Sequence, residues 1–207
     1  TYLARTSNIS KYTEGRFAPK WQLAGEAIAL EGPPKPDITP LPLPAPPDAA
    51  LRTGLILHED DLSPGFVLDA GITPVATAVV SSRAALSPLE VAPQVRDFAD
   101  RAASDTVTRF ADRLGHVTTV ALDADGLSAW AQSNGLEQVV APYAPVGPAA
   151  DVLAGLRSAP GAPPLRQVQR AYDAAAWPHA THGFFRFKDK IPKLLGQMRG
   201  LAAVATD

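Results

Sequence analysis

From Thr53 onward, short apolar runs alternate with segments whose apolar residues recur every three or four positions. The first pattern is typical of buried strands and the second of amphipathic helices. The predicted strands are Gly54–His58, Ile72–Val80, His116–Leu122, Leu136–Ala141 and a short one from Leu165. This alternation predicts an α/β fold: a Rossmann-like or flavodoxin-like layered domain over residues 51–198, with a mainly parallel sheet and helices on both faces.

Three segments between these strands have helical periodicity. The sequence Ser87-Pro88-Leu89-Glu90 has the form of a capping box, which predicts a helix beginning there. The residues expected to be buried along this segment are Val91, Val95, Phe98, Ala102, Thr106, Phe110 and Leu114. Asp123 or Asp125 is expected to cap a second helix that stops at Gly135. The third helix is expected to follow the turn Tyr143–Pro148.

The stretch from Tyr172 to Leu195 is rich in aromatic and basic residues. Apolar residues from Phe184 to Met198 follow a spacing of three and four, which predicts a closing helix after Thr181 as N-cap. Pro192 should kink this helix or start a new one. We expect the aromatic side chains to be buried and the basic ones to face solvent; they are Trp177, Phe184 and Phe187, and Arg186, Lys188, Lys190 and Lys193.

The front of the chain has a different character. Over residues 1–31, basic residues alternate with aromatic ones, a mixture that suits either nucleic-acid contact or docking on a neighbouring domain. The candidates for nucleic-acid contact are Arg5, Lys11 and Arg16 here, and Lys188 and Lys190 near the other end. Between Pro33 and Pro47, eight of fifteen residues are proline. This favours a semi-rigid polyproline spacer, so residues 32–50 are predicted to be a linker.

Composition narrows the function classes. The chain has no cysteine, which excludes thiolate chemistry, disulfides and cysteine-bound zinc and fits a cytoplasmic protein. No apolar run approaches the roughly 20 residues that span a bilayer, so no membrane partner is expected. Lys and Arg number six against thirteen Asp and Glu over residues 54–165, and seven against three over residues 166–207. The basic end fits an anionic partner or a solvated helix face.

Three stretches carry a family resemblance. The first, TYLARTSNISKYTEGRFAP, resembles the closing segment of the flavin-binding helical domain in a bacterial branch of the photolyase/cryptochrome flavoproteins. The stretches VVAPYAPVGPAAD and WPHATHGFFRFKDKIP are similar to the C-terminal α/β extension of that branch. The resemblance implies that residues 1–31 are the tail of an upstream FAD-binding helical domain, which would be the main partner of this part of the chain.

On this resemblance, the parent protein would use light-excited FAD for DNA repair or blue-light response. The helices that enclose FAD, and every catalytic residue, would lie upstream of Thr1, so we expect this fragment to bind no FAD and cannot place a catalytic residue in it. Residues 199–207 are expected to be a flexible C-terminus. The rival interpretations are a non-catalytic module that binds a nucleotide or a partner, and a structural extension that braces the flavin domain.

Candidate ligand contacts follow from the fold. Ligands of parallel sheets bind beyond the carboxyl ends of strands, where the turn containing Tyr143 and Gly147 is predicted. Trp177, His179 and His182 are the other candidates for ligand or interface contact. The two histidines lack a third ligand at helical spacing, and we predict no metal site. The run His58-Glu59-Asp60-Asp61 is interpreted as a solvated acidic loop.

Overall fold

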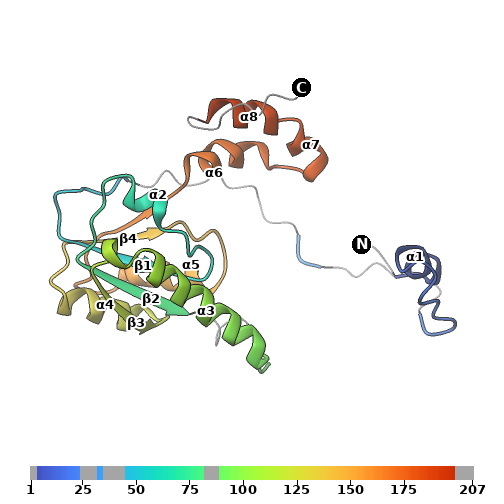
Figure 1. Cartoon of the computed structure of the whole chain (residues 1–207), viewed down its shortest axis with the longest axis horizontal. Helices are drawn as coiled ribbons and strands as arrows, with labels where there is room; N and C mark the ends of the chain where they lie inside the picture. Colours follow the sequence, from blue (N-terminus) through green and yellow to red (C-terminus); the bar gives the residue numbers. More distant parts are fainter. Residues whose placement is uncertain (1–3, 24–31, 35–44, 82–88, 199–207) are drawn as a thin grey trace. The chain divides into compact units, whose positions relative to one another are not determined.

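The computed structural model describes residues 4–23, 32–34, 45–81 and 89–198 (Figure 1). The chain forms two compact units, Thr1–Thr39 and Pro40–Asp207. Most of the predicted Pro-rich linker, the Ser87-Pro88 start of the predicted capping box and the predicted flexible C-terminus lie outside the described residues. Among the helices of the described ranges, none has the length and apolar composition needed to cross a membrane.

The second unit is built on a five-stranded sheet in which every strand pair is parallel. The strands are β1 (Thr53–Leu57), β2 (Ala76–Ser81), β3 (His116–Ala121), β4 (Gln138–Pro142) and β5 (Leu165–Val168). Their spatial order is β3-β2-β1-β4-β5. The chain therefore builds outward from β1 to β3, then returns to the other side of β1. The predicted α/β fold with a parallel sheet is confirmed.

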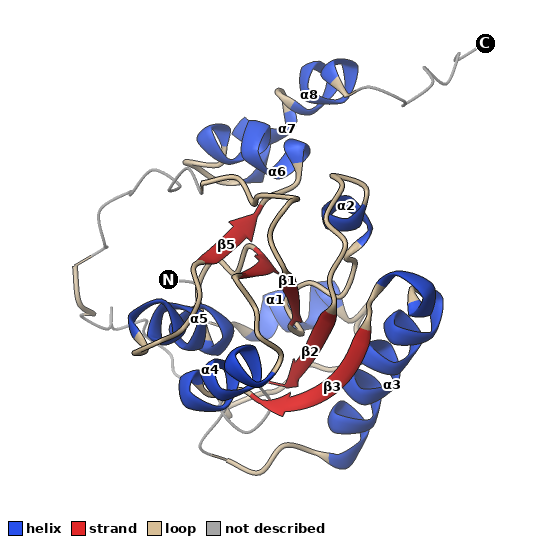
Figure 2. Ribbon diagram, turned by 90° about the vertical axis from the view of Figure 1, so that its left-hand side faces the viewer, coloured by secondary structure: helices blue, strands red, loops and turns tan. Residues whose placement is uncertain are grey.

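Helices cover both faces of this sheet, as expected (Figure 2). One face carries α2 (Gly65–Leu68) and α3 (Pro93–Arg109), and the other carries α4 (Ala124–Ser133) and α5 (Pro148–Ser158). Side chains of β1 alternate between the two cores. Ile56 packs in the core beneath α4 and α5, while Leu55 and Leu57 pack in the core beneath α2 and α3. A strand buried on both faces is a continuous apolar run, which is why β1 is readable in the sequence.

The ends of α4 follow the sequence signals. The Asp123 side chain accepts a hydrogen bond from the Gly126 amide at 2.6 Å, so Asp123 rather than Asp125 is the cap. Gly135 follows the C-cap residue Asn134 with φ of 59°. Glycine adopts this left-handed conformation without the steric cost that a Cβ would add.

The prediction for α3 is partly wrong. The helix begins at Pro93, later than the predicted capping box. Val95 and Phe98, expected to be buried, are 48% and 75% exposed, whereas Thr106 is buried. The reason is visible in Figure 1: the first half of α3 extends past the sheet, and the second half lies over it. A periodic apolar face indicates a helix, but it does not guarantee that a neighbour covers its whole length.

The predicted closing helix is replaced by a series of short ones. After β5 come α6 (Ala171–Ala176), the 3-10 helix η3 (Trp177–His179), α7 (Phe184–Lys188) and α8 (Ile191–Gln197). The expected new start near Pro192 is confirmed, because Pro192 lies in the first turn of α8. Thr181 is not a cap, since α7 follows Gly183.

The burial predicted for the aromatic side chains of this segment is largely wrong. Phe184 is 64% exposed and Trp177 is 41% exposed, while Phe187 is half-buried. The helix is interrupted between α7 and α8, so Phe184 and Leu194 do not lie on one continuous helical face. Leu194 is buried, and α8 packs against both α6 and α7.

The α/β unit begins upstream of β1. The backbone amide of Asp48 donates to Gln138 Oε1 at 3.1 Å, and Gln138 Nε2 donates to the Asp48 carbonyl and, at 2.7 Å, to Thr53 Oγ1. Gln138 is the first residue of β4 and is 1% exposed. The predicted start at residue 51 therefore omits residues that bond to the buried base of β4.

The first unit contains the helix α1 (Thr6–Tyr12), which has no buried residue. Thr6 Oγ1 donates to the Pro19 carbonyl at 2.5 Å, which joins the start of the helix to the segment after the turn. The chain turns at Gly15, which has φ of 77° and an amide 2.7 Å from the Ser10 carbonyl.

Candidate functional site

The strand order reverses between β1 and β4, and their carboxyl ends meet at one edge of the sheet. In parallel α/β sheets such a reversal opens a crevice in which ligands bind. His58, directly after β1, places its Nε2 2.9 Å from the carbonyl oxygen of Pro142, the last residue of β4. His58 is 1% exposed. The interpretation of residues 58–61 as a solvated loop is therefore wrong for His58.

A carbonyl oxygen only accepts hydrogen bonds, so Nε2 of His58 carries a proton and donates this one. Nδ1 is buried and has no hydrogen-bond partner among the described residues. His58 thus joins the two strands at the point of reversal and leaves one ring nitrogen unused.

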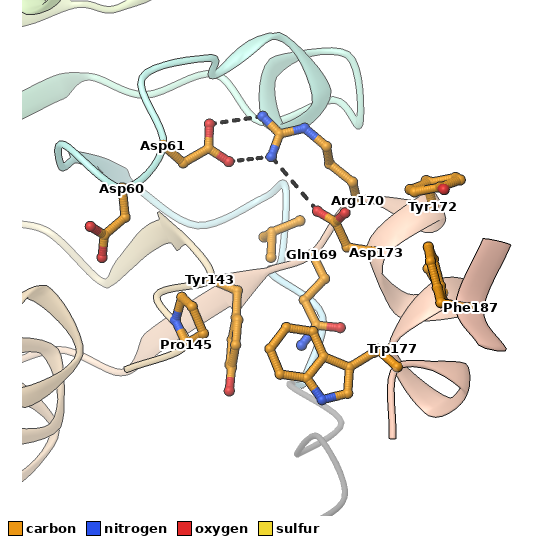
Figure 3. A pocket seen from close by; sticks show the side chains of 13 residues that line it. Asp60, Asp61, Tyr143, Pro145, Gln169, Arg170, Tyr172, Asp173, Trp177 and Phe187 are labelled. Carbon is orange, nitrogen blue, oxygen red and sulfur yellow. Dashed lines mark hydrogen bonds and ion pairs between the residues drawn. The ribbon is translucent and has the colours of Figure 1, made fainter. Parts of the chain in front are cut away.

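A pocket of about 390 Å³ opens beside this junction (Figure 3). Its walls come from the segments that follow β1, β4 and β5 and from α6 to α7. Asp60 and Asp61 follow β1, Tyr143 follows β4, and Gln169 and Arg170 follow β5. The pocket therefore lies at the position that the strand reversal predicts, and its size suits a small molecule.

Aromatic side chains form much of the wall. Tyr143 and Trp177 contact each other edge to face, with ring centroids 6.4 Å apart and an interplanar angle of 83°. Tyr172 and Phe187 also line the pocket, and in the view of Figure 3 Gln169 lies between Tyr143 on one side and Tyr172 and Phe187 on the other. Aromatic walls offer flat apolar surface to a planar ligand.

An ion pair between Arg170 and Asp61 forms one part of the pocket wall. Arg170 reaches Asp61 with both terminal nitrogens, and Nη2 lies 2.8 Å from Asp61 Oδ1 (Figure 3). The same nitrogen donates to the Ser63 carbonyl at 3.2 Å, and the guanidinium carbon lies 4.2 Å from the Phe66 ring centroid. Asp61 is only 12% exposed. The side-chain hydrogen bonds to Asp61, the largest cause, raise the pKa of Arg170 above its usual value despite the opposing effect of burial.

Gln169 provides an unused donor. Its side chain lines the pocket, and its Nε2 is buried without a hydrogen-bond partner in the part of the chain that the structure describes. Buried amide groups are satisfied in most proteins. An unsatisfied amide in a pocket wall therefore indicates a place where a ligand acceptor or a water molecule binds.

The structure brings together two of the five residues predicted from sequence for ligand or interface contact. Tyr143 and Trp177 line the pocket. Gly147 is the N-cap of α5, with φ of 119°, and does not line it. His179 and His182 are exposed and lie outside the pocket wall. His182 Nδ1 is 2.9 Å from Thr181 Oγ1, so its near neighbour is a hydroxyl.

The basic candidates fall on both units. Arg5, Lys11 and Arg16 are exposed in the first unit, where Lys11 and Arg16 lie over the rings of the residues that follow them. Lys188 and Lys190 are exposed in the second unit. Lys188 Nζ lies 5.4 Å from the centroid of the Phe185 ring. Within the described ranges, no group of three or more His, Asp or Glu side chains could hold a metal ion.

Sequence reasoning missed the pair formed by Asp61 and Arg170. These residues are 109 positions apart, and only the strand order brings them together. A signal was present: an acidic cluster directly follows one predicted strand, and a basic residue directly follows another. Both ends lie at the carboxyl edge of a parallel sheet, so opposite charges there are candidates for a pair.

Comparisons with known proteins leave the site to be judged by its geometry. No family model, no curated protein and no solved structure matches the chain.

Proposed function

We propose that the α/β unit is a binding module that holds a planar aromatic small molecule in the pocket between β1, β4 and β5. The observation that carries this proposal is the position of an aromatic-walled pocket at the strand reversal. The order β3-β2-β1-β4-β5 corresponds to five strands of the Rossmann dinucleotide-binding order and differs from the flavodoxin order. This supports a Rossmann-like unit.

The described side chains that line the pocket include acidic, aromatic and amide groups, but neither a serine nor a histidine. A serine–histidine pair is therefore not assembled among them. Tyr143, Trp177 and Gln169 would hold and orient a ligand.

The test is equilibrium dialysis of the chain against guanosine, adenosine and riboflavin. We expect saturable binding of at least one of these, and a loss of roughly 1–3 kcal/mol when Trp177→Ala removes a stacking surface. The matched control is Trp21→Ala, since Trp21 belongs to the other unit and is fully exposed. Absence of binding by all three compounds, with a folded protein, would contradict the proposal.

We further propose that the whole chain belongs to a photolyase/cryptochrome-like flavoprotein that acts in light-dependent DNA repair or blue-light response. The support is the similarity of residues 1–19, 139–151 and 177–192 to that family. On this proposal FAD binds to a helical domain upstream of Thr1. The chain purified alone should lose added FAD on desalting, and a longer protein that includes the upstream helices should retain it. Stoichiometric FAD on the chain alone would contradict this assignment.

A second candidate function, contact with single-stranded DNA, is favoured by one specific observation. Phe184 and Phe185 are 64% and 77% exposed, and their ring centroids lie 5.9 Å apart. Lys188 lies over the Phe185 ring. Exposed rings next to cations suit stacked bases and phosphates. If DNA binds there, Phe185→Ala should weaken the affinity for a labelled oligonucleotide by about 1–3 kcal/mol, and Phe98→Ala, an exposed ring on α3, should not.

A further inference from the structure

We propose that the pocket selects an unphosphorylated heteroaromatic ring whose amino or ring N–H groups face carboxylates. The inference rests on the proposed binding function and specifies its ligand class. It separates this pocket from the dinucleotide sites for which the same strand order is known, because phosphate would be disfavoured here.

The loop after β1 lacks the features of a phosphate site. In dinucleotide-binding sheets, this loop is rich in glycine, and the following helix presents backbone N–H groups to the pyrophosphate. Here the loop contains Glu59, Asp60 and Asp61. The following helix, α2, has four residues, and its N-cap is Pro64, which has no N–H. Phosphate would meet carboxylates where a dinucleotide site offers amide donors.

The charge of the pocket wall also disfavours a phosphate group. Three carboxylates, those of Asp60, Asp61 and Asp173, line the pocket, against the single guanidinium of Arg170. Arg170 is already engaged by Asp61, by the Ser63 carbonyl and by the Phe66 ring. Freeing it for a ligand phosphate would leave Asp61, which is 12% exposed, without its partner. The guanidinium is therefore part of the wall and not a phosphate receptor.

The remaining polar groups match a ring with donors and an acceptor. Asp173 lies 3.9 Å from Arg170 Nη1, a distance that leaves its oxygens able to accept from a ligand. Asp60 is exposed at the mouth. Gln169 Nε2 is the complementary donor and would meet a carbonyl or a ring nitrogen. With Tyr143 and Trp177 against its flat face, the favoured ligand is a base-like ring without phosphate.

The experiment compares the affinity of the whole chain for guanosine, for GMP and for inosine, which lacks the amino group of guanosine. We expect guanosine to bind about tenfold more tightly than GMP at low salt, since the phosphate approaches like charges. We expect inosine to bind more weakly than guanosine. Asp173→Asn should reduce both differences. The matched control Asp112→Asn, an exposed carboxylate outside the pocket wall, should leave them unchanged.

The outcomes are distinguishable. GMP binding as tightly as guanosine, or more tightly, would overturn the inference and leave the binding function standing. Equal affinity for guanosine and inosine would overturn the amino-group assignment. If none of the three compounds binds and neither adenosine nor riboflavin does, the binding function itself fails, and this inference fails with it.

Discussion

The indole ring of Trp130 in α4 packs directly on the backbone of β1 at Gly54. A Cβ added to Gly54 would lie 2.6 Å from Cη2 of Trp130 and closer still to Cδ1 of Leu136. Trp130 is 6% exposed, and its ring contributes to the core between the sheet and α4–α5. Glycine within a strand usually weakens it, but it also permits such a close approach. Gly54 is therefore a packing requirement of this core.

Gly54→Ala should lower the free energy of unfolding by about 1–3 kcal/mol, because the added methyl group overpacks the core. The measurement is chemical denaturation followed by circular dichroism. Gly196→Ala is the matched control, since no atom of the described residues lies within 4 Å of a Cβ at Gly196 in α8. In the double variant Gly54→Ala, Trp130→Leu, the change in the free energy of unfolding should differ from the sum of the changes in the two single variants, because the two residues are in contact. Equal stability of the Gly54 and Gly196 variants would contradict this account.

The pair formed by Arg170 and Asp61 should contribute measurably to stability. Arg170→Gln should cost about 1.5–3 kcal/mol, because hydrogen bonds to a mostly buried carboxylate are lost. Arg113→Gln is the control: its partner Asp69 is 71% exposed, and exposed ion pairs contribute about 0–1 kcal/mol. Hydrogen bonds to Asp61 raise the pKa of Arg170 above its usual value, so its contribution is fully present below the usual pKa of arginine and is lost only as the pH rises through the raised pKa. Urea denaturation at neutral pH is therefore a sufficient test, and similar costs for the two variants would argue against a special role for Arg170.

Leu194, and not the aromatic side chain of Phe184 that was predicted to be buried, should stabilise the closing helices. Leu194→Ala removes a side chain that is 4% exposed and should cost about 2–5 kcal/mol. Phe184→Ala removes a larger ring that is 64% exposed and should change stability by less than about 0.5 kcal/mol. Thermal unfolding of both variants checks this. A larger loss for Phe184→Ala would show that the ring is buried in solution.

The hydrogen bonds of Asp48 set the minimal folded unit. A chain beginning at Ala45 should unfold cooperatively. One beginning at Leu51 leaves the amide of Gln138, which is 1% exposed, without the Asp48 backbone, and should be less stable by about 1–3 kcal/mol. Comparing the two midpoints in urea tests the boundary. Identical midpoints would place the boundary at residue 51.

The presence of the five strands was predictable because it depends on local composition, although β2 begins at Ala76 and not at the predicted Ile72. β1 and β4 are buried along their whole length, so each is an apolar run that can be recognised without knowing its neighbours. Caps such as Asp123 are equally local. The exposure of Val95 and Phe98 was not predictable, because the spacing of apolar residues does not reveal how far α3 extends past the sheet.

The pocket was only partly predictable for a related reason. Tyr143 directly follows an obvious strand, so its place at the carboxyl edge follows from the fold class. The pairing of Asp61 with Arg170 depends on which strands are neighbours, and so does the bond between His58 and Pro142. Strand order is a long-range property, and the apolar pattern of this chain is compatible with more than one order.

The hydrogen bonds between Asp48 and Gln138 also determine at which end of the sheet a support can be attached to the α/β unit. β4 begins at Gln138 and ends at Pro142, so at about 3.3 Å per residue the two edges of the sheet are about 13 Å apart along this strand. The pocket opens at one edge, and the chain enters at the other. A support or a reporter protein attached before Ala45 would therefore leave the mouth of the pocket accessible, which makes this end the suitable handle for immobilised binding measurements.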